Sequence, residues 1–275
     1  GSEQHWTLPW RPWSGAMAFV AAAVFTGLGL AAVSQTTRAD LNYSYASQAQ
    51  DQLPALEKAD LQDLRGVAVY GYQELAADPA SLDTDEHSEF DQWRQGLLSA
   101  EQRLQEAPAS AATLLPFYRR ASGALLMLLA ARAMERAVTL CPHEVKYQVY
   151  LGLAYEELFH RAQPLRRELW FKKAVQAYQR SVELNPGNAY YRGNLGRLFA
   201  TAAEAGNQAF YKQAEARYLE AVRLAPVTRL FYENLILLEA HYAGLEVVGA
   251  VMDQVQARDP ELAPSLLIAA ASTIF

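Results

Sequence analysis

The hydropathy pattern begins with an unbroken apolar run. Between Ala16 and Val33 the chain reads AMAFVAAAVFTGLGLAAV, in which Thr26 is the only polar side chain. Counted from Ser14, the run has about 20 residues, and a helix of that length spans about 30 Å, the thickness of a bilayer core. We therefore predict a transmembrane helix over residues 14–34.

The residues around this run support the same interpretation. A Trp-rich segment over 1–13 carries Trp6, Trp10 and Trp13 where an interfacial aromatic belt would lie, and one arginine on each side leaves the orientation open. Two alternatives remain, a cleaved signal peptide and a buried soluble helix, although the run is long for the first and lacks a polar edge for the second. Gly1-Ser2 resembles a scar of tag removal, and the missing initiator Met indicates part of a longer chain.

The next section, over 39–109, is rich in helix-forming residues. We expect helices at about 39–52 and 54–77, with Pro54 in the first turn of the second, and another at about 88–106. Between 78 and 91 there are six acidic side chains and no Lys or Arg. Because this stretch lacks the alternation and the glycine of a calcium loop, we interpret it as a solvated acidic loop. The apolar stretch from Ala124 is interrupted by charges and predicts a buried soluble helix.

A repeated motif dominates the rest of the chain. The segments 137–142, 181–186 and 221–226 read AVTLCP, SVELNP and AVRLAP, and a weaker copy ends at Pro260. Their prolines are 44, 40 and 34 residues apart. A period in this range is typical of a solenoid built from helix pairs.

Other positions keep the same register. Five residues after each of the first three prolines there is an aromatic side chain (Tyr147, Tyr191, Phe231), and nine residues after each there is a leucine (Leu151, Leu195, Leu235). Ten residues after the first two prolines there is a glycine (Gly152, Gly196). Eight residues before the second and third prolines there is a tyrosine (Tyr178, Tyr218). This pattern resembles the tetratricopeptide repeat (TPR). Small residues let helices A and B of a repeat approach, aromatics fill the space between repeats, and the proline ends helix B.

The predicted fold is therefore all-α, a TPR-like α-solenoid of helix hairpins over 114–264, preceded by one N-terminal transmembrane helix. The residues in excess of the usual 34 are expected between helices A and B, at 160–169 and 205–210. The apolar segment 265–275 predicts a C-terminal helix. It packs near Leu237 and Val251, docks on a partner or membrane, or leads into further chain.

A membrane span followed by Arg38-Ala39-Asp40, a helical stretch and these repeats resembles the C-terminal region of bacterial O-antigen polymerases or ligases. The stretches NPGNAYYRGNLGRL at 185–198 and LAPVTRLFYENL at 224–235 carry the resemblance. It implies a part of a membrane protein that assembles surface polysaccharide. The family's earlier spans and its large periplasmic loop with catalytic basic residues are absent from this sequence, so no catalytic residue is transferred.

Composition narrows the chemistry. The chain is 51% hydrophobic and 20% charged, with a formal charge of −6 and a mean hydropathy of −0.10. The acidic balance disfavours nucleic-acid binding, which needs a basic surface. The lone Cys141 excludes an internal disulfide, and the histidines show no ligand spacing, so no metal or cofactor is expected. No catalytic motif is recognisable, and an enzyme with an unrecognised helical site is the least favoured class.

TPR stacks usually bind peptides or protein segments on a concave face lined by helix A. The repeat register places these candidate partner-binding residues there: Lys146, Glu156, His160, Tyr190, Arg197, Glu233 and His241. The alternative for each is a solvated helix face. A basic cluster is expected either to touch anionic lipid headgroups or to form a solvated turn: Arg161, Arg166, Arg167, Lys172 and Lys173.

These features predict a scaffold for protein–protein interaction, anchored in the bacterial inner (cytoplasmic) membrane by the single span 14–34. The side of the membrane on which the repeats lie stays open. One version is the C-terminal part of a polysaccharide polymerase or ligase. The other is an independent single-span TPR assembly factor or subunit of a membrane protein complex.

Overall fold

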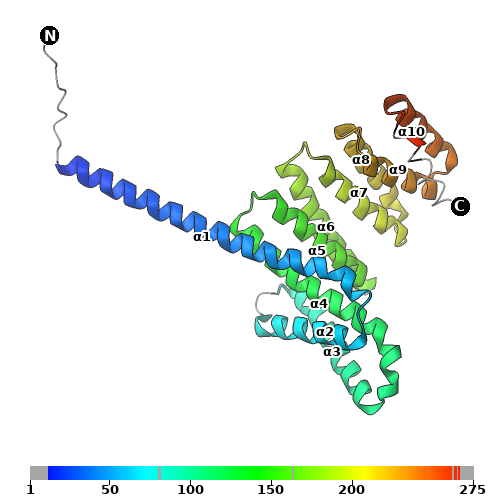
Figure 1. Ribbon diagram of the computed structural model, residues 1–275, viewed down its shortest axis with the longest axis horizontal. Coiled ribbons are helices and arrows are strands. Elements are labelled where there is room, and N and C mark those ends of the chain that lie inside the picture. The colour runs from blue at the N-terminus through cyan, green and yellow to red at the C-terminus, as the bar shows by residue number, and fades with distance from the viewer. Residues whose placement is uncertain (1–11, 80–81, 163, 262, 265, 267–275) are drawn as a thin grey trace, which may run out of the picture.

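The structure is a computed structural model that describes residues 12–79, 82–162, 164–261, 263–264 and 266, with side chains from Leu30 onward except at 85, 164, 165 and 245. Every regular element in these residues is helical, which confirms the all-α prediction (Figure 1). The helices are α1 (Pro12–Leu56), α2 (Leu61–Ala77), α3 (Thr84–Glu106), α4 (Ala111–Leu140), α5 (Val145–Arg161), α6 (Pro164–Leu184), α7 (Ala189–Glu204), α8 (Tyr211–Leu224), α9 (Arg229–Tyr242) and α10 (Leu245–Arg258), with short 3-10 helices η2 (Pro108–Ser110) and η3 (Gln208–Phe210).

The pairs α5–α6, α7–α8 and α9–α10 are hairpins, and each stacks on the next through α6 against α7 and α8 against α9. Within a hairpin the helices meet at a glycine. A Cβ atom at Gly152 would lie 2.5 Å from the Tyr178 ring, and one at Gly196 would lie 2.7 Å from the Tyr218 ring. Two hairpins thus use the same Gly–Tyr contact in the same register, which confirms the predicted role of the small residues.

Aromatic side chains fill the space between hairpins, as the pattern predicts. The ring of Phe231 covers Gly193, where an added Cβ would lie 2.7 Å away, and its centroid is 5.2 Å from that of Tyr190. Helices α4 and α8 end just before the residue that precedes proline. Those residues, Cys141 and Ala225, have φ −136° with ψ 76° and 73°. The proline ring excludes the helical conformation from the residue before it, so the motif stops helix B.

Helices α1 and α4 form a pair at the start of the stack, in which α1 also touches α5 and α2 covers another side of α4. The pair α2–α3 is inserted between α1 and α4. The prediction that Pro54 begins a helix is wrong, because Pro54 lies inside the last turn of α1. A proline there removes only one hydrogen bond near the helix end. Helix α2 starts later, where the Asp60 carboxylate accepts the Asp63 N–H at 2.9 Å.

The acidic segment 78–91 is not a solvated loop. Helix α3 already starts at Thr84, and Glu86 and Glu89 are 2% and 1% exposed. The Asp83 carboxylate accepts the Glu86 N–H at 2.8 Å, while the Glu86 carboxylate accepts the Asp83 N–H at 3.1 Å. This reciprocal capping box satisfies the first donors of the helix and explains why α3 begins four residues earlier than predicted.

The two expected insertions differ in form. At 205–210 the chain does leave the helix after Glu204, turns at Gly206 with φ 112°, and forms η3. At 160–169 the predicted interhelical loop is wrong, because α5 continues to Arg161 and α6 starts at Pro164. The extra residues instead lengthen the helices, since proline is favoured at the first helical position.

No helix in the part of the chain whose residues are fully described is long and apolar enough to cross a membrane. The backbone of 14–34 belongs to α1, but most of that segment precedes Leu30, and the Trp-rich segment 1–13 likewise lies outside the described side chains. The C-terminal segment 265–275 is also outside them except for Leu266, which is buried in one cluster with Val248 and Val255.

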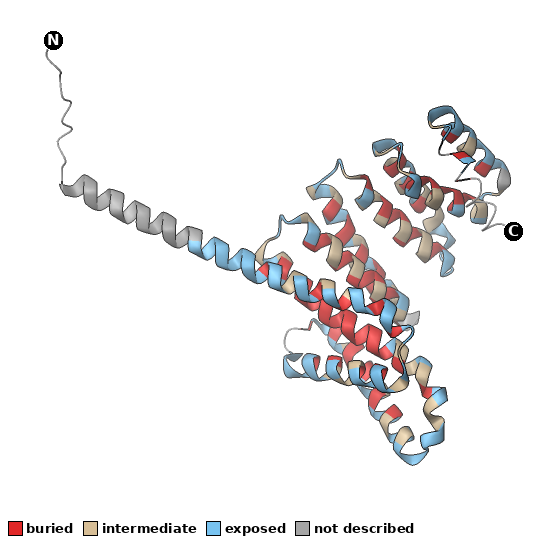
Figure 2. Ribbon diagram, viewed as in Figure 1, coloured by how far each residue is buried: buried red, intermediate tan, exposed pale blue. Residues whose placement is uncertain are grey.

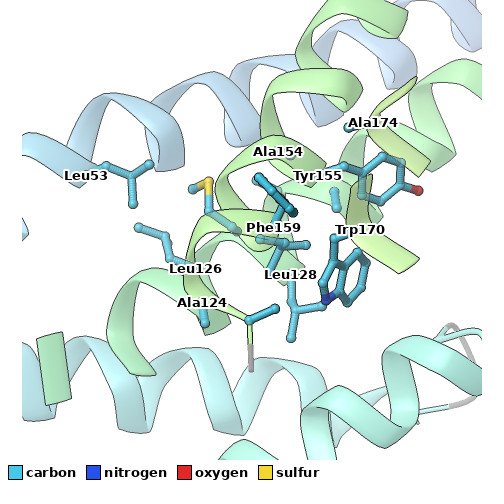
Figure 3. Packing of buried hydrophobic residues seen from close by; sticks show 14 of the residues in the cluster. Leu53, Ala124, Leu126, Leu128, Ala154, Tyr155, Phe159, Trp170 and Ala174 are labelled. Atoms are coloured by element: carbon cyan, nitrogen blue, oxygen red, sulfur yellow. The ribbon is translucent and has the colours of Figure 1, made fainter. Parts of the chain in front are cut away.

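The main core follows α4, where every residue from Ala121 to Met134 is buried, as predicted for a soluble buried helix (Figure 2). Figure 3 shows the side chains that meet there. Leu53 of α1 and Leu126 of α4 lie on one side, and Trp170 of α6 is fully buried on the other. Because one cluster joins α1 through α9, the insertion and the hairpins are packed on a common core.

Candidate functional site: the helix A face

The seven candidate residues lie on the first helix of each hairpin, as the repeat register predicts. Lys146, Glu156 and His160 are on α5, Tyr190 and Arg197 are on α7, and Glu233 and His241 are on α9: the helices here called helix A. The structure uses these side chains in two different ways. Some of them join neighbouring helices inside the fold, and others remain at the surface.

Lys146 joins α5 to α1. Its Nζ lies 2.9 Å from Oδ1 of Asp40 and 5.1 Å from the ring centroids of both Tyr43 and Tyr147. The Tyr147 hydroxyl donates to the same carboxylate at 2.7 Å. These two hydrogen bonds, that of Tyr147 first, hold the pKa of Asp40 below its ordinary value. Lys146 is therefore held by an ion pair within the chain, which joins α5 to α1.

Glu156 and Arg197 connect α5 to α7. Glu156 is 1% exposed, accepts a hydrogen bond from the Tyr178 hydroxyl at 2.7 Å, and forms an ion pair with Arg197. Burial raises the pKa of Glu156, while the Arg197 charge opposes the rise. A buried carboxylate needs such partners, and this triad links α5, α6 and α7.

Among the surface candidates, His160 lies on α5, and the other three lie on α7 and α9. Tyr190 is 56% exposed, His160 and His241 are exposed, and Glu233 accepts a hydrogen bond from Arg229 at 2.5 Å. Two residues that the sequence analysis did not include among the binding candidates, Leu230 and Leu237, are 47% and 38% exposed on α9.

A register signal for the two leucines was present in the sequence. Leu230 follows Pro226 by four residues, as Tyr190 follows Pro186, and Leu237 holds the position of Arg197. Residues 230, 237 and 241 share one side of a helix, and Tyr190 reaches α9 through its contact with Phe231. We call the surface formed by Tyr190, Leu230, Leu237 and His241 the α7–α9 face.

Most of the basic cluster 161–173 is paired with acidic residues of the same chain. Lys173 forms ion pairs with Asp83 and with Glu86, the latter at 3.0 Å. Arg166 lies 3.8 Å from the Glu89 carboxylate. These contacts dock the start of α3 against α6, and the acidic and basic segments satisfy each other.

Glu135 of α4 borders this charge network. Its carboxylate accepts a hydrogen bond from the Tyr155 hydroxyl. Burial, followed by the charge of Glu86, raises the pKa of Glu135 to about 7. Within the described residues no group of three or more His, Cys, Asp or Glu side chains is placed to hold a metal ion.

No protein-family model and no curated protein matches the chain. Among solved structures, a thermophilic TPR protein of Thermus thermophilus matches with 18% sequence identity and a TM-score of 0.45. The match covers 69% of this chain and 97% of that one. The TPR-like character of the present chain stands on its own repeated contacts, Gly152 with Tyr178 and Gly196 with Tyr218.

Proposed function

We propose that this chain is a TPR-type scaffold that binds a protein segment on the α7–α9 face. The observation that supports it is the exposure of three large apolar side chains, Tyr190, Leu230 and Leu237, on the surface where such repeats bind peptides. Burying apolar surface contributes roughly 25 cal/mol per Å², and tyrosine is a frequent anchor of interfaces. Glu233 and His241 beside them supply polar contacts at the rim.

We further propose that residues 14–34 anchor this scaffold in the bacterial inner membrane. The support is the apolar sequence of the segment and its continuity with α1, which runs unbroken from Pro12 to Leu56. A tether of this kind raises the effective concentration of the scaffold near membrane partners. Tethering and binding are separable, because the α7–α9 face lies on helices that do not contact α1 extensively.

Site-specific photo-crosslinking in the host cell tests the binding proposal. A photoreactive phenylalanine analogue is introduced in place of Tyr190 or Leu237, and in place of the exposed Gln179 of α6 as the matched control. We expect one discrete protein adduct at positions 190 and 237 that is absent at 179. Equal labelling at all positions, or no adduct at 190 and 237, contradicts the proposal.

The finer assignment, the C-terminal part of a polysaccharide polymerase or ligase, is supported by the resemblance of 185–198 and 224–235 to that family. The competing assignment is an independent single-span assembly factor. In both, this chain itself acts by binding and not by catalysis. The gene decides between them, since about ten encoded spans upstream of Glu3 favour the polymerase or ligase. A start codon immediately before Glu3 excludes it.

A further inference from the structure

A pocket lies where the two insertions into the repeat come together. It has a volume of about 360 Å³ and opens between α5, α6, α7 and η3. Arg167 and Lys172 come from the lengthened start of α6, and Asn207 and Phe210 come from the turn and η3 that separate α7 from α8. Repeats of 34 residues have neither insertion, so this pocket is an addition to the basic hairpin stack.

The inner wall of the pocket is aromatic. Phe159 and Phe171 are buried, and Phe210 is half-buried. The ring centroid of Phe171 lies 4.7 Å from that of Phe210 and 5.9 Å from that of Phe159. A planar or branched apolar group entering the pocket would therefore meet ring faces and edges and lose its contact with water.

The rim carries one cation that no other described residue neutralises. Lys172 is paired with Glu168 at 2.6 Å. Arg167 forms no hydrogen bond or ion pair with any residue whose side chain is described, and its Nε is buried without a partner. A buried Nε–H without an acceptor is energetically unfavourable, because it has lost water without gaining a hydrogen bond. The rim thus has an excess positive charge at Arg167.

We propose that this pocket binds a protein segment that carries a large apolar side chain next to a carboxylate. The side chain packs against Phe159, Phe171 and Phe210, and the carboxylate pairs with the Arg167 guanidinium in the geometry that arginine favours for carboxylates. A peptide fits better than an enclosed small molecule, because Glu168, Lys172 and Asn207 at the rim are exposed and let a chain continue over the surface. This site is distinct from the α7–α9 face.

The test uses the full chain and the peptide Gly-Ser-Asp-Trp-Asp-Ser-Gly with a 5-fluoro label on tryptophan, observed by fluorine NMR. We expect saturable line broadening. Two unlabelled competitor peptides separate the contributions of the carboxylate and the apolar side chain to binding. In one, Asn replaces Asp and removes the negative charge. In the other, Ala replaces Trp and removes the apolar group. Each is expected to compete at least about fivefold more weakly than the unlabelled parent peptide. Equal competition by the Asn peptide overturns the role of the carboxylate, and tighter binding of free N-acetyl-tryptophan overturns the assignment to a peptide.

Variants connect the binding to this pocket. Arg167→Gln should weaken the parent peptide at least about fivefold, and Ala205→Trp should block the pocket from its exposed rim. The matched control is Arg180→Gln, which removes the same charge from an exposed part of α6 and should leave binding within about twofold. Circular dichroism and melting temperature verify that each variant is folded. Equal losses in Arg167→Gln and Arg180→Gln, or unchanged binding in Ala205→Trp, overturn the proposal.

Discussion

At the scale of single residues, the hairpins depend on the absence of a side chain at two helical positions. Gly152 and Gly196 face the rings of Tyr178 and Tyr218, which are 0% and 3% exposed. A glycine inside a helix costs about 1 kcal/mol relative to alanine, so its use here indicates that close approach of helices A and B is worth more than that.

Gly152→Ala is therefore expected to destabilise the protein by about 1–3 kcal/mol, because the new Cβ would lie 2.5 Å from the Tyr178 ring and force the helices apart. The matched control is Gly66→Ala in α2, where nothing lies within 4 Å of the added atom. That variant should gain roughly 0.5–1 kcal/mol through helix propensity. Urea denaturation measures both, and equal stabilities for the two variants would show that the contact is not tight.

Glu135 makes the stability of the fold depend on pH. Its pKa of about 7 exceeds the ordinary value of 4.5, because of burial first and Glu86 second. Between these two values the folded protein holds a proton that the unfolded chain releases, so the free energy of unfolding falls as pH rises through this window. Glu135→Gln should flatten the decline in melting temperature between pH 5 and 7.5 (roughly the window set by the two pKa values). The exposed Glu183→Gln serves as control and should leave the decline unchanged.

The repeat register placed the candidate residues on helix A, but it did not show which of them the fold itself uses. Lys146 is neutralised by Asp40, a residue 106 positions away, and Glu156 by Arg197, 41 positions away. Such pairings depend on how α1 and α7 pack against α5, and no local pattern contains that information. The positions of Leu230 and Leu237 on helix A, in contrast, follow from the repeat register alone.

At the scale of elements, the insertion α2–α3 is attached to the repeats by charge as well as by apolar packing. Lys173 has a side chain that is 17% exposed, and it is the cation that faces the buried Glu86 and the capping residue Asp83. Loss of one partner of a buried ion pair leaves an uncompensated charge, which is costlier than loss of both.

Lys173→Gln should therefore destabilise the protein by about 3–5 kcal/mol and open the first turns of α3. Its neighbour Lys172 provides a control, since its ion pair with Glu168 is exposed and worth at most about 1 kcal/mol. Hydrogen exchange of amides 84–93 locates the effect, and the melting temperature gives its size. If Lys172→Gln and Lys173→Gln behave alike, the network does not hold α3.

The boundaries of these elements show what local sequence can and cannot determine. The hairpins and their ends followed from the spacing of proline, glycine and aromatics. The start of α3 was also encoded locally, in the Asp83-x-x-Glu86 capping box, but the run of acidic residues suggested solvent exposure. Exposure was the wrong inference because the compensating cations come from α6, about 80 residues later.

At the scale of the whole molecule, the contacts of the first hairpin with α1 show which of its ends lies nearer to the predicted transmembrane span. The turn after α4 lies beside the middle of α1, where Thr36 and Asp40 of α1 line one groove with His143 of the turn. The far end of α5 reaches the end of α1, where Arg161 lies 3.8 Å from Glu57. Turns from helix B to the next helix A therefore lie toward residue 34, and turns within hairpins lie away from it (Figure 1).

If residues 14–34 span a bilayer, this arrangement orients the scaffold. The turn at 141–144 lies next to the lipid surface, while Glu57 is 19 residues beyond Arg38 and thus about 28 Å farther along α1. The basic cluster, which contacts the end of α1 through Arg161, then points away from the headgroups. Because α1 is one continuous helix, it would also fix the distance from the bilayer at which the α7–α9 face meets a membrane partner.

Spin labels test this orientation. In a Cys141→Ser background, single cysteines replace His143 and Glu57, both exposed, and the labelled full chain is placed in nanodiscs with a relaxation agent attached to the lipid headgroups. The label at 143 should relax strongly and the label at 57 weakly, because relaxation enhancement falls steeply across a separation of about 28 Å along the helix. Equal enhancement at both positions would mean that α1 lies along the surface. Enhancement at neither would mean that 14–34 does not anchor the protein, a result that leaves binding at the α7–α9 face to be judged by its own crosslinks.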